Sequence, residues 1–257
     1  MAGFRFIEHG DRHLPVLLLA NSLCANDSMW DAQVEAWSKH RRILRFNYAG
    51  HGPYGVPVAY TDAAPLAEFL MKALDDAEVH EFDFVGLSLG GMLGLAIAGV
   101  AAGRLRGMVV ANGRIHQTDQ GRALWAERIA KVRAHGVASI VDETIDRWFT
   151  AQFLERRPSA IERTRSMMRG VSAAGYCAAA EIVRSFDGRS NLNKLPARTL
   201  FLAAAQDTAA PAAHLEEFAR FAGSEFVCLA DCAHLANVEC PAEFNRTVSD
   251  FLAQRPV

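Results

Sequence analysis

The sequence has few cysteines and almost no net charge, and each shortage excludes a class of protein. Five cysteines among 257 residues are too few, and odd in number, for a scaffold held together by disulfides. The 27 basic and 29 acidic side chains leave a net charge of −2. A general nucleic-acid-binding protein needs a basic face that neutralises phosphates. We therefore expect neither a disulfide framework nor a nucleic-acid partner.

The sequence also lacks an uninterrupted apolar segment of membrane-spanning length. One uncharged stretch, residues 84–103, is long enough, but it contains six glycines, two of them adjacent. A strand, a glycine turn and a buried helix explain it better, so no membrane partner is predicted. The first residues show no basic region followed by an apolar run, which predicts no signal peptide and a cytoplasmic location.

Apolar residues make up 51% of the chain and recur in short runs that alternate with helical patterns. Strands are predicted at residues 4–7, 16–20, 43–46, 82–87, 105–110, 199–204 and 226–229. Helices are predicted between them at residues 31–40, 62–77, 92–102, 212–221 and 242–252. This alternation predicts the α/β class, with a mostly parallel, doubly wound sheet covered by helices on both faces.

The alternation stops in the middle of the chain. Residues 113–186 contain helical patterns only, at 121–135, 137–153, 160–168 and 173–186. We interpret this segment as a helical cap, or lid, inserted into an α/β core that comprises residues 1–112 and 187–257.

The strongest chemical signal is the run Gly86-Leu87-Ser88-Leu89-Gly90, which follows a predicted strand and opens a predicted helix. In this G-x-S-x-G arrangement the serine sits on a sharp turn that presents its hydroxyl above the sheet. The flanking glycines let neighbouring backbone pass without a Cβ clash. The pattern predicts Ser88 as a nucleophile.

A nucleophilic serine needs a base and an acid that orients the base, and in this arrangement they follow the serine in the order acid, then histidine. Of the histidines after the cap, His214 lies in an amphipathic helix and is expected at the surface, whereas His234 follows a strand. Asp207 also follows a strand and is the favoured acid. The alternative acid is Asp231, three residues before His234.

Two backbone N–H groups are expected to stabilise the oxyanion. One belongs to Leu89, directly after the serine, and the other to Leu23, in the loop after the second strand.

A metal site is not predicted, although Cys228, Cys232, His234 and Cys240 lie close together in the sequence. Their spacing lacks the paired short knuckles of zinc sites, and buried free thiols are the expected alternative. No phosphate-binding glycine loop stands between a strand and a helix, so no cofactor is predicted either.

At this point the chain resembles the α/β-hydrolases and, within them, the 3-oxoadipate enol-lactonases. The resemblance covers nearly the whole chain and rests on residues 21–23, 28–31, 86–92, 125–133, 147–150, 175–176 and 233–239. It implies the α/β-hydrolase fold, lactone hydrolysis through an acyl-enzyme, and a place in the β-ketoadipate pathway of aromatic-compound breakdown.

Two loops depart from the family pattern. The family's Asp-x-Arg-Gly-His-Gly turn is replaced by Asn-Tyr-Ala-Gly-His-Gly at residues 47–52, and the loop 206–211 lacks the usual Thr-Pro-Pro. Both loops border the expected pocket, so they bear on substrate identity.

A family enol-lactone carries a free carboxylate, and arginine binds carboxylates through a bidentate geometry. Arg114, at the end of a strand, is the first candidate for this role, and Arg133 in the cap is the second. Trp125 and Trp148 are candidates for the pocket walls. Eleven basic against seven acidic side chains give residues 114–169 a net charge of +4, which suits an anionic substrate.

We therefore expect a hydrolase that cleaves a small lactone or ester, such as a 3-oxoadipate enol-lactone. The alternatives on the same fold are a general carboxylesterase, a C–C bond hydrolase and a ligand receptor with slow turnover. The expected partner is the small-molecule substrate, and both a monomer and a homo-oligomer are compatible with the sequence.

Overall fold

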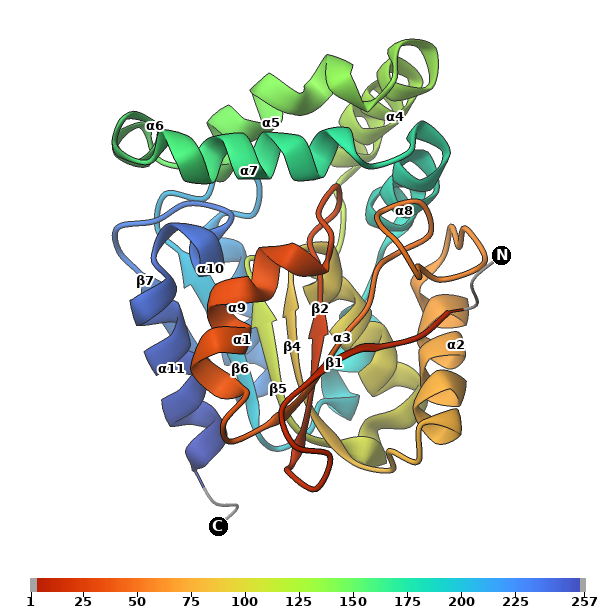
Figure 1. The fold of residues 1–257 in the computed structure, drawn as a ribbon, viewed down its shortest axis with the longest axis vertical. Helices are drawn as coiled ribbons and strands as arrows, with labels where there is room; N and C mark the ends of the chain where they lie inside the picture. Colours follow the sequence, from red (N-terminus) through yellow and green to blue (C-terminus); the bar gives the residue numbers. More distant parts are fainter. Residues whose placement is uncertain (1–3, 255–257) are drawn as a thin grey trace.

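The computed structural model describes residues 4–254 and contains one seven-stranded sheet (Figure 1). The strands are β1 (Ile7–His9), β2 (Val16–Ala20), β3 (Arg42–Arg45), β4 (Phe82–Leu87), β5 (Leu105–Ala111), β6 (Thr199–Ala204) and β7 (Glu225–Leu229). Their order is β1-β3-β2-β4-β5-β6-β7, and every pairing is parallel except that of β1 with β3. This confirms the predicted doubly wound α/β class.

The central strands are buried because helices cover both faces of the sheet. Every residue of β4 and of β6 is buried, as continuous apolar runs in parallel sheets are expected to be. The covering helices are α1 (Asp31–Trp37), α2 (Ala63–Asp76), α3 (Leu89–Ala101), α9 (Ala212–Ala222) and α11 (Pro241–Ala253). Helix α3 lies against α2, and α1 lies against α11.

Between β5 and β6 the chain forms helices only. They are α4 (Asp119–His135), α5 (Val141–Trp148), α6 (Ala151–Arg156), α7 (Pro158–Arg169) and α8 (Ala173–Ser185). Figure 1 shows them lying across the top of the sheet, and we call residues 113–186 the cap. No helix within residues 4–254 is both long and apolar enough to cross a lipid bilayer.

The cap is joined to the core by two chain segments that pair with each other. The backbone N–H of Gln117 donates to the carbonyl of Phe186 at 3.2 Å, and that of Gly188 donates to the carbonyl of Ile115 at 2.8 Å. The N–H of Ile115 in turn donates to Nε2 of His214 at 3.0 Å. The entry and exit of the cap are thus tied together and anchored to α9.

Four local predictions were wrong. The first strand lies at Ile7–His9 rather than at residues 4–7. The helix expected at residues 137–153 is broken into a 3-10 turn, α5 and α6, because Phe149 is extended and Thr150 starts a new helix as its N-cap. His214 is half-buried rather than a surface residue. Cys228 is exposed and lies on β7, an edge strand that pairs with β6.

Candidate active site

Ser88 occupies a strained turn between β4 and α3. Its φ of 58° and ψ of −112° lie in a region that L-residues rarely adopt. A Cβ on Gly86 would lie 2.2 Å from the carbonyl oxygen of Gly90, and one on Gly90 would lie 2.1 Å from that of Ala20. Only glycine fits at both positions, so the spacing expected from the sequence has a steric cause in this turn.

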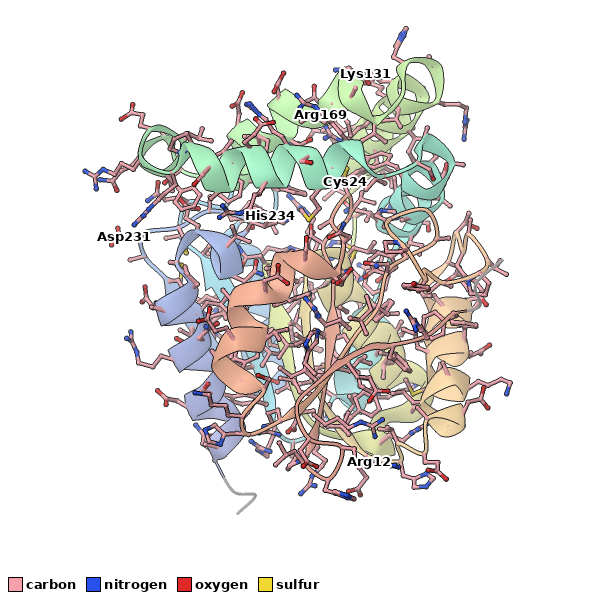
Figure 2. The ribbon with its side chains drawn as sticks, in the orientation of Figure 1. Arg12, Cys24, Lys131, Arg169, Asp231 and His234 are labelled. Atoms are coloured by element: carbon pink, nitrogen blue, oxygen red, sulfur yellow. The ribbon has the colours of Figure 1, made fainter. Side chains whose placement is uncertain are left out.

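His234 and Asp207 form a buried hydrogen-bonded pair. Nδ1 of His234 donates to Oδ2 of Asp207 at 2.7 Å, and both side chains are almost fully buried. Because Nδ1 is engaged, Nε2 is the ring nitrogen available to the cavity that His234 and Ser88 both line. Asp231, the alternative acid, is exposed and lies at the edge of the molecule, away from His234 (Figure 2).

The carboxylate of Asp207 is fully engaged by donors. The backbone N–H groups of Ala209 and Ala210 donate to Oδ1 at 2.7 and 2.9 Å, and Nδ2 of Asn112 donates to Oδ2 at 3.0 Å. Burial alone would raise the pKa of Asp207, but His234 and these donors lower it below the usual value. The group is therefore held as a carboxylate that can orient an imidazole.

Sequence reasoning missed Asn112, which follows β5 and has a φ of 46°. Its backbone N–H donates to the carbonyl of Leu202 at 2.8 Å, which fixes the side chain beside Asp207. The available signal was an Asn-Gly pair directly after a predicted strand, because asparagine tolerates positive φ better than other non-glycine residues.

The two expected oxyanion donors belong to the first residue of a helix and to the loop after β2. Leu89 is the first residue of α3, where backbone N–H groups have no partner within the helix. Leu23 lines the same cavity as Ser88. Two hydrogen bonds to Phe46 and Tyr48, which follow β3, hold its loop in place. Nδ2 of Asn21 donates to the carbonyl of Phe46 at 2.8 Å, and the hydroxyl of Tyr48 donates to the carbonyl of Asn21 at 3.0 Å.

The altered turn at residues 47–52 supports this loop as well. Nδ2 of Asn47 donates to Oδ1 of Asp27 at 2.9 Å, and the N–H of Asp27 donates to Oδ1 of Asn47 at 2.7 Å. Where the family carries an aspartate, the amide both donates and accepts. His51 in the same turn is buried, and burial lowers its pKa to about 4.

Most of the predicted site residues line one inner cavity of about 60 Å³. They are Leu23, Ser88, Arg114, Trp125, Trp148 and His234. The ring of Trp148 stacks on that of His234, with centroids 6.3 Å apart and an interplanar angle of 29°. Figure 2 shows His234 and Cys24 together below the cap helices. Arg133 is exposed on α4 and lies outside the described residues that line this cavity.

Three arginines converge on this cavity, two of which sequence reasoning had not selected. Nε of Arg114 donates to the carbonyl of Ala209 at 2.9 Å, and burial lowers its pKa. Nε of Arg128 donates to the hydroxyl of Tyr176 at 2.8 Å. Arg147 lines the cavity from α5, and burial and the charge of Arg128 lower its pKa. Arg147 could have been selected from the sequence, because it stands next to Trp148 in the segment 147–150 that resembles the enol-lactonases.

Comparisons with known proteins agree with this geometry. Residues 16–247 match the model of the "Alpha/beta hydrolase family". The crystal structure of the enol-lactonase from Burkholderia xenovorans LB400 superimposes with a TM-score of 0.90 at 31% identity, covering 97% of this chain and 96% of that one. A hydrolase from Pseudomonas aeruginosa PA01 superimposes with a TM-score of 0.89 at 35% identity, covering 97% and 94%.

A curated relative points to the same group of enzymes. The "3-oxoadipate enol-lactonase 2" of Acinetobacter baylyi is 28% identical over 239 residues, which cover 93% of this chain and 89% of the relative.

Proposed function

The chain belongs to the α/β-hydrolase family and acts as a hydrolase on ester or lactone bonds, and we propose that it cleaves a small, carboxylate-bearing lactone through an acyl-enzyme on Ser88. The observation that carries the proposal is the shared inner cavity. It brings together a strained serine, a histidine with a free Nε2 and an arginine.

In the proposed mechanism Nε2 of His234 takes the proton of Ser88 while the serine oxygen attacks the lactone carbonyl. Asp207 holds the imidazole through Nδ1 and stabilises its positive charge. The backbone N–H groups of Leu23 and Leu89 donate to the oxyanion, at a worth of roughly 3 kcal/mol per donor.

The ring oxygen then leaves, and the acyl group stays on Ser88. The imidazolium of His234 gives its proton to this leaving oxygen, and when the substrate is an enol-lactone the resulting enol tautomerises to a ketone and draws the reaction forward. His234, now neutral again, deprotonates a water molecule that attacks the acyl carbonyl. The acid is released as the proton passes from His234 to the oxygen of Ser88.

A panel of lactones and esters tests the reaction. We expect Ser88→Ala to lower kcat on every cleaved substrate by about 10⁵-fold, because the nucleophile itself is removed. A fluorophosphonate should label Ser88 in the wild-type protein and leave Ser88→Ala unlabelled, as detected by mass spectrometry. Full turnover by Ser88→Ala would contradict the proposal.

The same panel separates the alternatives. A general carboxylesterase would prefer neutral esters to anionic lactones, and a C–C bond hydrolase would cleave a β-diketone more rapidly than either. A ligand receptor with slow turnover would bind these compounds without rapid steady-state hydrolysis.

For the substrate carboxylate we propose Arg114 as the partner in the inner cavity, because its Nε is held by Ala209 and its terminal nitrogens remain for a ligand. Arg114→Gln should raise KM for a carboxylate-bearing lactone about 10-fold and leave a neutral ester nearly unchanged. Arg133→Gln, on the exposed side of α4, is the matched control. Equal losses on both substrates would contradict the assignment.

A further inference from the structure

A second and larger cavity lies against the inner one. It measures about 570 Å³ and shares with the inner cavity the residues Arg114, Gln117, Trp125, Arg128, Arg147 and Ala209. The shared residues form the boundary between the two spaces, and we call the larger one the outer cavity. A substrate that enters through the outer cavity passes these residues before its carbonyl reaches Ser88.

The wall of the outer cavity carries more positive than negative charge. On the α4 and α5 side, Glu143 accepts from Nζ of Lys131 at 2.9 Å and is also bonded by a terminal nitrogen of Arg128. Burial would raise the pKa of Glu143, but the Lys131 bond and the charges of Arg128 and Arg147 lower it. On this side two carboxylates, Glu143 and Glu127, therefore face three cations, Lys131, Arg128 and Arg147.

Two of these three cations, Lys131 and Arg128, form ion pairs with Glu143. Besides Glu143, Arg128 bonds the hydroxyls of Tyr176 and Thr144, and its side chain is only 12% exposed. Arg147 borders both cavities, and among the described residues it makes no ion pair within 4.0 Å. Arg147 is partly exposed to solvent, and the nearby charge of Arg128 disfavours its positive charge, so a bound anion would relieve this repulsion.

We propose that the outer cavity is a capture site for small carboxylates, centred on Arg147, which an anionic substrate occupies before its carbonyl reaches Ser88. The proposal deepens the proposed function but concerns binding alone. Arg128 is a positioning residue here, because Tyr176, Thr144 and Glu143 hold it in place while Arg147 is left for the ligand.

Capture by charge has a kinetic consequence. Positive residues in a cleft raise the local concentration of anions and speed their association, and dissolved salt screens this effect. For an anionic lactone kcat/KM should fall as ionic strength rises, whereas a neutral ester of similar size should show little change.

The direct test is a binding measurement that needs no turnover. Ser88→Ala is titrated with glutarate, and the fluorescence of Trp125, which lines both cavities, reports occupancy. Trp125→Phe in the same background assigns the signal. We expect saturable binding that weakens with added salt and falls about 10-fold or more in Ser88→Ala combined with Arg147→Gln.

Two controls distinguish capture at Arg147 from a general attraction of anions to the basic cap. Arg133→Gln removes an exposed cation from the same cap and should leave glutarate binding and its salt dependence unchanged. Neutral glutaramide should bind weakly at every salt concentration. Binding of glutarate that is equally tight in Arg147→Gln, or insensitive to salt, would overturn the proposal.

The binding result is separable from hydrolysis. If the wild-type protein cleaves no lactone or ester while Ser88→Ala binds glutarate through Arg147, the proposed function fails and the capture site stands. If wild-type cleaves an anionic lactone rapidly but its kcat/KM is independent of salt and of Arg147, the capture site fails and the proposed function stands.

Discussion

The core and the cap handle charge in opposite ways. In the core, the carboxylate of Asp207 is buried and receives four donors, and Asp83 is paired with Arg41. In the cap, arginines outnumber their carboxylate partners along the cavity wall. The core therefore supplies fixed groups suited to a chemical step, whereas the cap supplies positive charges that an incoming anion can neutralise. We infer that the two regions divide reaction from recognition.

The difference extends to packing. Strands β4 and β6 are buried along their whole length, and α3 has ten buried residues. Helix α4 in the cap has only two, Ile129 and Val132, although it is the longer helix. Substitutions should therefore affect stability mostly in the core, and substrate preference mostly in the cap.

The largest effect expected from this contrast between core and cap is on Asp207, the proposed acid of the core. Asp207→Asn preserves the size of the side chain but cannot hold the imidazole in the required tautomer, so kcat should fall by about 10⁴-fold. Asp231→Asn, at an exposed position in a neighbouring loop, is the matched control and should change kcat less than about 2-fold. A larger loss in Asp231→Asn would reverse the assignment of the acid.

The second effect compares packing in the two regions. Phe84 is fully buried in β4, and its ring lies against Gly94 of α3. Phe84→Ala should lower the free energy of unfolding by about 3–5 kcal/mol, because it removes buried surface and leaves a cavity. Leu124→Ala, at a position 58% exposed on α4, should change it by less than about 0.5 kcal/mol in the same urea titration. Similar losses of unfolding free energy in both variants would contradict the expected difference in packing between core and cap.

The third effect concerns the contact between the core and the cap, where the turn that carries His51 meets the segment just before α8. The N–H of Ser172 donates to the carbonyl of Gly50 at 2.8 Å, beside His51. Burial lowers the pKa of His51 to about 4, so between pH 6.5 and 4 the unfolded chain binds a proton that the folded protein does not. Stability should therefore rise with pH across this window and fall as the solution is acidified.

His51→Gln should reduce that loss by on the order of 2 kcal/mol, measured as the difference in free energy of unfolding between pH 7 and pH 4.5. His80→Gln, at an exposed position, should leave the pH dependence as in the wild type. An unchanged slope in His51→Gln would show that His51 is protonated without cost.

Local patterns predicted most of the fold because its elements are locally consistent. The bounds of β4 and β6 were predicted to the residue, since continuous apolar runs between turn residues are typical of buried parallel strands. The break at Phe149 was missed because the helical pattern continues across it, whereas in the structure Thr150 caps a new helix and Trp148 docks on the loop that carries His234. There the carbonyl of Trp148 accepts from the N–H of Leu235 at 3.1 Å.

The sequence by itself determined the elbow of Ser88 and the chain order of serine, acid and histidine, because both depend on short motifs at strand ends. Only the tertiary structure placed Asp207 rather than Asp231 against His234, brought Asn112 beside it, and placed Arg147 rather than Arg133 beside the cavity. Those choices depend on where residues far apart in the chain meet. Distances between such residues arise from packing, which no local pattern encodes.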